Sequence, residues 1–115
     1  MNVTIDNNKI IVGENECRFD HPILDYVHSD GVYIVVLNIP KGTKEIDNVY
    51  GVNENGKLIW KIQSVTDAFG IAENTPYISI RIDESDSVVV NNFFGMRYEV
   101  DPSDGTLKKK ECISW

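Results

Sequence analysis

The sequence predicts one all-β domain over residues 1–115, with about nine or ten strands in antiparallel meanders. The first observation is composition: 13 Val and 14 Ile stand against 4 Leu and 2 Ala, and β-branched residues favour strands over helices. The second is the presence of 11 Asn and 8 Gly, which supply the left-handed backbone positions of hairpin turns. The third is a spacing of roughly ten residues between turn signals, which is typical of meanders.

The first expected element is a hairpin over residues 2–13, whose strands flank a turn at Asp6-Asn7-Asn8. Two kinds of strand are expected after it. Residues 32–37 and 88–90 are continuously apolar, which indicates central strands that are covered on both faces or lie in the middle of a sheet. In the other strands apolar and polar residues alternate, so one face lies on the core and the other in water. These alternating segments are residues 57–62, 77–83 and 97–100.

Residues 66–69 carry the helical signal. Ser64 or Thr66 is a suitable N-cap, and Gly70 is a suitable end. A single helical turn has little stability of its own, so an irregular loop is the alternative.

An approximate internal repeat covers residues 23–64 and 76–115. Each half contains an apolar strand, a strand with a tyrosine, and a glycine before a return strand. The matching segments are Asp30–Val36, Tyr50–Asn53 and Gly56–Leu58 in the first half, and Asp86–Val90, Tyr98–Asp101 and Gly105–Leu107 in the second. We expect two related meanders that pack face to face or form a partly open barrel. The alternative is that the two halves share only the general pattern of all meanders.

Most aromatic side chains are expected in the core, because they fall on the apolar phase of a strand. Phe93 and Phe94 are adjacent, so their rings point to opposite faces if this stretch is a strand. One of the two is then exposed or covers a sheet edge. Trp115 is either a lid on the core or an anchor for another subunit.

The chain is acidic, with 18 acidic and 11 basic residues and a net charge of −7. Residues 65–101 carry seven acidic and two basic side chains, so most of the excess lies there. Such a surface repels nucleic acid and anionic membranes and favours a basic protein partner. We therefore expect neither nucleic acid nor a membrane as partner. The candidate partner-binding residues are Asp67, Glu73, Asp83, Glu84 and Asp86.

No pattern of residues points to catalysis, a cofactor or a metal. Cys17 and His21 lie near Asp20, but a spacing of four on a strand or loop fixes no proximity, and no activating motif surrounds the cysteine. A zinc site from Cys17, His21, His28 and Cys112 would lack the short paired spacings typical of such sites. The sequence therefore predicts a domain that is not an enzyme.

The expected location is the cytoplasm. Residues 1–11 show no basic start followed by a long apolar run, so neither a signal peptide nor a transmembrane helix is expected. In that compartment Cys17 and Cys112 are expected as reduced, partly buried thiols; a bridge between them is the alternative.

Residues 48–62 read Asn-Val-Tyr-Gly-Val-Asn-Glu-Asn-Gly-Lys-Leu-Ile-Trp-Lys-Ile. This segment resembles the outer hairpin of a quinoprotein-type β-propeller repeat. In that family an apolar strand reaches Asp or Asn, turns through Gly-Lys, and returns through an aliphatic pair and a Trp that packs between blades. The resemblance implies that Trp60 is a packing residue. Closed propellers stack many blades of about forty residues, so the length excludes a closed ring and its central cofactor site.

A wider likeness covers most of the chain. It is carried by Phe19, Pro22-Ile23, Leu37, Ile39–Gly42, Asn48–Val52, Gly56–Trp60, Gly95–Tyr98, Asp101-Pro102 and Gly105. These residues resemble a group of short, stand-alone bacterial β proteins of unassigned activity. In size, charge and lack of a catalytic motif, the chain is also similar to immunity proteins of bacterial toxin systems.

The sequence thus predicts a non-enzymatic protein-binding domain with an acidic surface. Its sharpest version is an immunity-type inhibitor that is steered to a basic toxin or nuclease and occludes its active site. One alternative is a small-ligand or carbohydrate-binding accessory module, which a deep apolar pocket lined by Trp60 or a tyrosine would favour. A second alternative is a structural subunit of a homo-oligomer.

Overall fold

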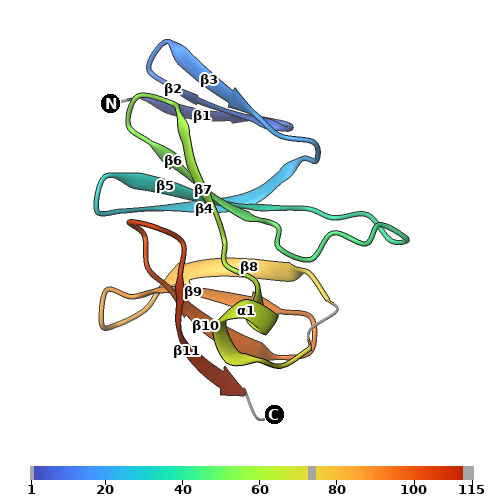
Figure 1. The fold of residues 1–115 in the computed structure, drawn as a ribbon. Helices are drawn as coiled ribbons and strands as arrows, with labels where there is room; N and C mark the ends of the chain where they lie inside the picture. Colours follow the sequence, from blue (N-terminus) through green and yellow to red (C-terminus); the bar gives the residue numbers. More distant parts are fainter. Residues whose placement is uncertain (1, 73–74, 113–115) are drawn as a thin grey trace.

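The computed structural model describes residues 2–72 and 75–112, with side chains up to Lys108. Within these ranges the chain forms eleven strands in three antiparallel sheets and one short helix, α1 (Val65–Phe69) (Figure 1). The predicted all-β class and its antiparallel meanders are confirmed, with somewhat more strands than expected. None of the described helical structure is long and apolar enough to cross a membrane.

Each sheet is a meander, because strands that are consecutive in the sequence are neighbours in the sheet. The first sheet consists of β1 (Val3–Asp6), β2 (Lys9–Val12) and β3 (Asn15–Arg18). The second sheet consists of β4 (Ile23–Ser29), β5 (Val32–Leu37), β6 (Val49–Asn53) and β7 (Leu58–Lys61). The third sheet consists of β8 (Tyr77–Ile82), β9 (Val88–Asn92), β10 (Met96–Val100) and β11 (Leu107–Cys112).

The three sheets form an open stack, with the second sheet between the other two (Figure 1). Strand β5 explains this arrangement, because all six of its residues are buried. Val32, Ile34 and Val36 belong to the core shared with the third sheet, whereas Tyr33, Val35 and Leu37 belong to the core shared with the first. The prediction of a strand covered on both faces is therefore confirmed for residues 32–37.

The N-terminal sheet is larger than the predicted hairpin. Residues 3–12 do pair as expected, with Asp6 opposite Lys9 at the turn. Strand β3 then adds to β2, so that Arg18 lies opposite Lys9 and Cys17 lies opposite Ile10. Its four residues, Asn-Glu-Cys-Arg, show little apolar alternation, and this is why the sequence pattern missed it.

The second and third sheets correspond to the two predicted repeats. Asp30 and Asp86 both lie in the turn before the second strand of their sheet, each with left-handed backbone, at φ 51° and 61°. Gly56 and Gly105 likewise precede the last strand of each sheet, at φ 77° and 78°. The sheets differ most in their middle connection, which is the long loop 38–48 in the second sheet and a tight turn in the third.

The predicted helical turn is confirmed as α1. The Ser64 hydroxyl accepts a hydrogen bond from the backbone N–H of Asp67 at 3.0 Å and so caps the first turn. Gly70 ends the helix in the left-handed conformation at φ 70°. Val65 is buried, and the ring of Phe69 stacks near that of Tyr98. The helix is thus stabilised by packing on the third sheet.

Candidate functional site

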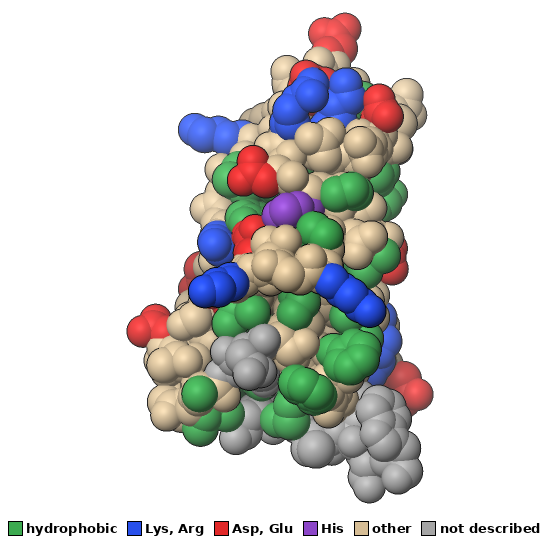
Figure 2. Space-filling model, turned by 90° about the vertical axis from the view of Figure 1, so that its right-hand side faces the viewer, with side chains coloured by type: hydrophobic (Ala, Val, Ile, Leu, Met, Phe, Trp, Pro, Cys, Tyr) green, Lys and Arg blue, Asp and Glu red, His purple; other side chains and the backbone are tan. Residues whose placement is uncertain are grey.

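A cleft of about 290 Å³ lies where the second and third sheets meet. One wall is residues 39–43 of the long loop; the other is formed by Thr75, Pro76, Ile78 and Phe93. We call it the loop cleft. Figure 2 views the molecule from the side on which the long loop projects in Figure 1, and hydrophobic side chains gather on this face over the third sheet. Lysine and arginine side chains stand at the edges of that apolar area.

Two phenylalanines at the edge of the cleft are exposed to solvent. Phe93 is 68% exposed and Phe94 is 64% exposed, with their rings 5.7 Å apart in a T-shaped pair. The Asn92 side-chain oxygen accepts hydrogen bonds from the N–H groups of Phe94 and Met96, each at 3.0 Å. Gly95 completes the turn at φ 81°. Opposite faces were expected only if this stretch is a strand; the Asn-Phe-Phe-Gly segment is instead a turn, and both rings are exposed.

Asn48 joins the two walls of the loop cleft. Its side chain is fully buried at the end of the long loop. Its Nδ2 donates hydrogen bonds to the carbonyl oxygens of Leu37 at 2.7 Å and Tyr77 at 2.9 Å. Its Oδ1 accepts a hydrogen bond from the N–H of Tyr77 at 2.8 Å. One amide thus pairs with the ends of β5 and β8, and it fixes the spacing of the walls.

The far end of the long loop is anchored by Glu45. Its Oε1 accepts a hydrogen bond from the Tyr50 hydroxyl at 2.8 Å and lies 3.9 Å from Lys61 Nζ. Its Oε2 lies 3.5 Å from His21 Nε2. Burial, and then the hydrogen bond to Glu45, raise the pKa of Tyr50 far above its usual range, so the hydroxyl stays a donor. These contacts fasten the loop to the second sheet and leave residues 40–44 as its free rim.

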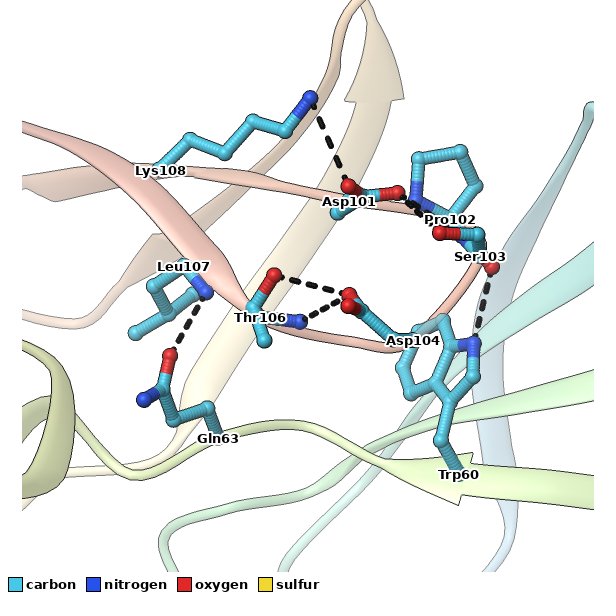
Figure 3. Close-up of polar contacts among 9 residues, drawn as sticks. All are labelled: Trp60, Gln63, Asp101, Pro102, Ser103, Asp104, Thr106, Leu107 and Lys108. Carbon is cyan, nitrogen blue, oxygen red and sulfur yellow. Dashed lines mark hydrogen bonds and ion pairs between the residues drawn. The ribbon is translucent and has the colours of Figure 1, made fainter.

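Trp60 locks the second sheet to the third (Figure 3). Its indole N–H donates a hydrogen bond to the carbonyl oxygen of Pro102 at 2.8 Å. Its ring lies against the backbones of Gly51 and Gly105, where an added Cβ would collide with it. Nearby, the side-chain oxygen of Gln63 accepts a hydrogen bond from the N–H of Leu107 at 3.0 Å. Trp60 is thus a buried packing residue, as the propeller resemblance implied.

A family described as "Domain of unknown function (DUF7957)" matches residues 1–112. The chain belongs to this family. No curated protein matches it. The DUF7957 chain is also similar to the crystal structure of BamB from Moraxella catarrhalis, with a TM-score of 0.60 and 11% sequence identity.

The similarity to BamB covers 96% of the DUF7957 chain and 32% of the BamB chain. The chain therefore spans about a third of the length of that protein. BamB is β-propeller-like, so the comparison supports a fold of propeller-like sheets, and at this identity it concerns the fold alone. Neither comparison supports the likeness to toxin-immunity proteins.

The acidic residues predicted for partner binding are only partly brought together in the DUF7957 domain. Asp83, Glu84 and Asp86 share the β8–β9 turn, at the opposite end of β9 from Phe93. Asp67 lies on α1 and exposes its side chain. Glu73 lies outside the described residues. The predicted site is therefore one turn of three carboxylates with a fourth carboxylate on a different element.

Basic groups lie beside the acidic turn. Arg81 and Arg97 line a polar hollow of about 320 Å³ together with Asp83, Glu84 and Ser85. The Asp83 carboxylate also accepts hydrogen bonds from the N–H groups of the turn it belongs to. The backbone hydrogen bond from Ser87 is the main cause that lowers the pKa of Asp83. Asp83 thus shapes the turn, whereas the side chains of Glu84 and Asp86 are exposed.

Cys17, His21 and His28 form no metal-binding cluster among the residues that the structure describes. Among the described residues, no three His, Cys, Asp or Glu side chains lie close enough to hold a metal ion. Cys17 is a free thiol whose pKa is raised by burial, which opposes thiolate formation. His28 stacks on Tyr33 and lies 3.3 Å from Glu54. The side chain of Cys112 lies outside the described residues.

Proposed function

We propose that this DUF7957 domain is a non-enzymatic protein-binding module and that the loop cleft is its binding site. The observation that carries the proposal is the exposure of Phe93 and Phe94 on a hydrogen-bonded turn beside an apolar hollow. Large exposed apolar patches usually mark interaction sites, and aromatic anchors in pockets carry much of the affinity of protein interfaces. The hydrogen bonds of Asn92 hold this turn in place, so little conformational entropy is lost on binding.

The proposal predicts that Phe93→Ser strongly weakens binding without unfolding the domain. The ring is mostly in solvent, so its loss changes stability little, but it removes an interface anchor worth about 2 kcal/mol or more. The test is to pan a random peptide display library on the domain and to measure the affinity of enriched peptides by calorimetry. We expect Phe93→Ser to weaken the affinity of these peptides at least about thirtyfold.

The matched control is Leu58→Ser on β7. Leu58 is 46% exposed but does not line the cleft, so this change removes an exposed apolar side chain elsewhere. Leu58→Ser should bind the enriched peptides with the affinity of the wild type. The proposal is wrong if the library yields no specific peptide, or if enriched peptides bind wild type and Phe93→Ser equally well.

A second candidate is binding of a basic protein at the β8–β9 turn, with an immunity-type inhibitor of a toxin or nuclease as its narrow form. The support is the net charge of −7 and the gathering of Asp83, Glu84 and Asp86 in one turn. Arg81 and Arg97 beside the turn weaken its field, so we rank this candidate second. For an immunity-type inhibitor we also propose a cytoplasmic location.

Removing charge from the turn tests this candidate. We combine Glu84→Lys with Asp86→Asn, because asparagine tolerates the left-handed backbone of Asp86 at φ 61°. Stopped-flow association with a panel of small basic nucleases should slow about tenfold at low salt, with a weaker salt dependence. The control pair, Glu14→Lys with Asp20→Asn, changes the net charge equally at exposed sites elsewhere. Unchanged rates in the first pair, or equal slowing in both pairs, would exclude steering by this turn.

The alternative of a small-ligand or carbohydrate module receives less support. A pocket lined by Trp60 or a tyrosine was the feature expected for it. Trp60 is instead buried against two glycines, and it lines neither the loop cleft nor the polar hollow. A homo-oligomeric subunit stays an open alternative.

A further inference from the structure

We infer that the loop cleft takes an extended protein segment in which an apolar side chain is flanked by acidic residues. This inference rests on the proposed function and names the chemistry of its partner. The apolar part follows from the floor and edge of the cleft, which include Pro40, Pro76, Ile78 and Phe93. Ile78 is 48% exposed at the irregularity where β8 begins to pair with β9. An inserted apolar side chain would cover these groups.

The acidic part follows from the charges on the rim. Lys41 and Lys44 are exposed on the long loop, and Lys41 lines the cleft. Neither lysine has an ion pair with a residue that the structure describes. The nearest carboxylate in the sequence, Glu45, already contacts Tyr50, His21 and Lys61. Carboxylates that flank the apolar side chain would therefore find unused positive charge at the rim.

The rim is also preformed. The carbonyl oxygen of Pro40 accepts a hydrogen bond from the N–H of Thr43 at 3.3 Å, and Gly42 adopts φ 88°. This turn carries Lys41, while Asn48 and Glu45 fix the end of the loop. A segment that binds here would meet a wall that is already shaped, and this reduces the entropy lost on binding.

An anionic membrane also attracts lysines and exposed phenylalanines, but two observations favour a protein segment. The apolar groups line a hollow of about 290 Å³, which suits one inserted side chain better than a flat lipid surface. The net charge of −7 repels an anionic bilayer as a whole. A short acidic segment interacts mainly with the rim, because the charges of the rest of the domain are screened beyond about 10 Å at ordinary salt.

The test compares fluorescent peptides that differ only in charge. Each has a leucine–phenylalanine centre, with aspartates, lysines or serines on both sides, and binding is measured by fluorescence anisotropy at low and high salt. Vesicles of phosphatidylserine and phosphatidylcholine form a fourth arm. We expect the aspartate peptide to bind at least about tenfold tighter than the lysine peptide, and its affinity to fall with salt.

The test variant is Lys41→Glu with Lys44→Glu, and the matched control is Lys57→Glu with Lys108→Glu, two exposed lysines that do not line the cleft. The Lys41/Lys44 variant should bind the aspartate peptide about tenfold or more weakly, and this binding should depend less on salt. The control variant should change the affinity less than about threefold. Equal binding of the three peptides, equal loss in both pairs, or binding to vesicles alone would overturn the inference. If library peptides still require Phe93 while the sign of the flanking charge has no effect, the proposed function stands and this inference fails.

Discussion

Trp60→Ala is expected to lower the free energy of unfolding by about 3–5 kcal/mol, the usual loss for a large buried aromatic residue. The side chain is 8% exposed and belongs to the core shared by the second and third sheets. Its removal leaves a cavity between the sheets and leaves the Pro102 carbonyl without its indole partner. Urea denaturation followed by circular dichroism measures the change. Trp60→Phe should lower the free energy of unfolding much less, because a ring still fills most of the space.

The two glycines that contact Trp60 provide an independent check. A Cβ added at Gly51 would collide with Trp60 Cε2. The backbone of Gly51 does not have a positive φ, so the collision is the main cost of this substitution. Gly105→Ala combines a collision with Trp60 Cε3 at 2.5 Å with strain at φ 78°. Gly13→Ala has comparable strain at φ 62° but meets nothing within 4 Å. We expect Gly51→Ala and Gly105→Ala to destabilise the domain clearly more than Gly13→Ala; equal losses in all three would contradict a tight contact around Trp60.

Asn48→Leu is expected to destabilise the domain by about 3 kcal/mol or more. The substitution keeps a similar volume but removes the three buried hydrogen bonds of the Asn48 side chain: those to the carbonyls of Leu37 and Tyr77 and that from the N–H of Tyr77. Loss of one partner of a buried hydrogen bond costs about 1–3 kcal/mol. Chemical denaturation measures the loss, and Asn55→Leu at an exposed turn position is the matched control, with little expected change.

Asn48 also links stability to the cleft. A variant that still folds, such as Asn48→Ser studied at low temperature, should bind library peptides more weakly because its two walls are less firmly joined. If Asn48→Leu were as stable as the control variant, the bridge between β5 and β8 would have no energetic role.

Most of the fold could be predicted from the sequence, because burial in sheets leaves a regular pattern. The continuous apolar run 32–37 gave the central strand, and paired Asx and Gly positions gave the turns. Strand β3 was missed since its residues are mostly exposed and polar. Trp60 was found through a resemblance, but its partners Gly51 and Gly105 lie in different sheets, and no local pattern connects them.

The candidate site was much harder to predict. The loop cleft depends on a contact between Asn48 and Tyr77, 29 residues apart, and hydrogen bonds at such a separation leave no periodic signal. The turn that exposes Phe93 did have a signal: Asn92 and Gly95 have the same spacing as Asn53 and Gly56 in the recognised turn of the second sheet. Because acidic residues are in excess, the sequence predicted partner binding at the β8–β9 turn instead. Composition could not reveal that Arg81 and Arg97 lie beside those carboxylates.

Hydrogen–deuterium exchange of the whole domain, with and without the aspartate-flanked peptide, shows directly whether the loop cleft is the binding site. If the peptide binds in the loop cleft, exchange should slow at residues 39–43, 75–78 and 92–95, the segments that form the cleft and its aromatic edge. Exchange in the β8–β9 turn, residues 83–87, should stay the same because this turn lies at the other end of β9. Slower exchange at residues 83–87 with no change around the cleft would show that the peptide binds elsewhere and that the loop cleft is not the binding site.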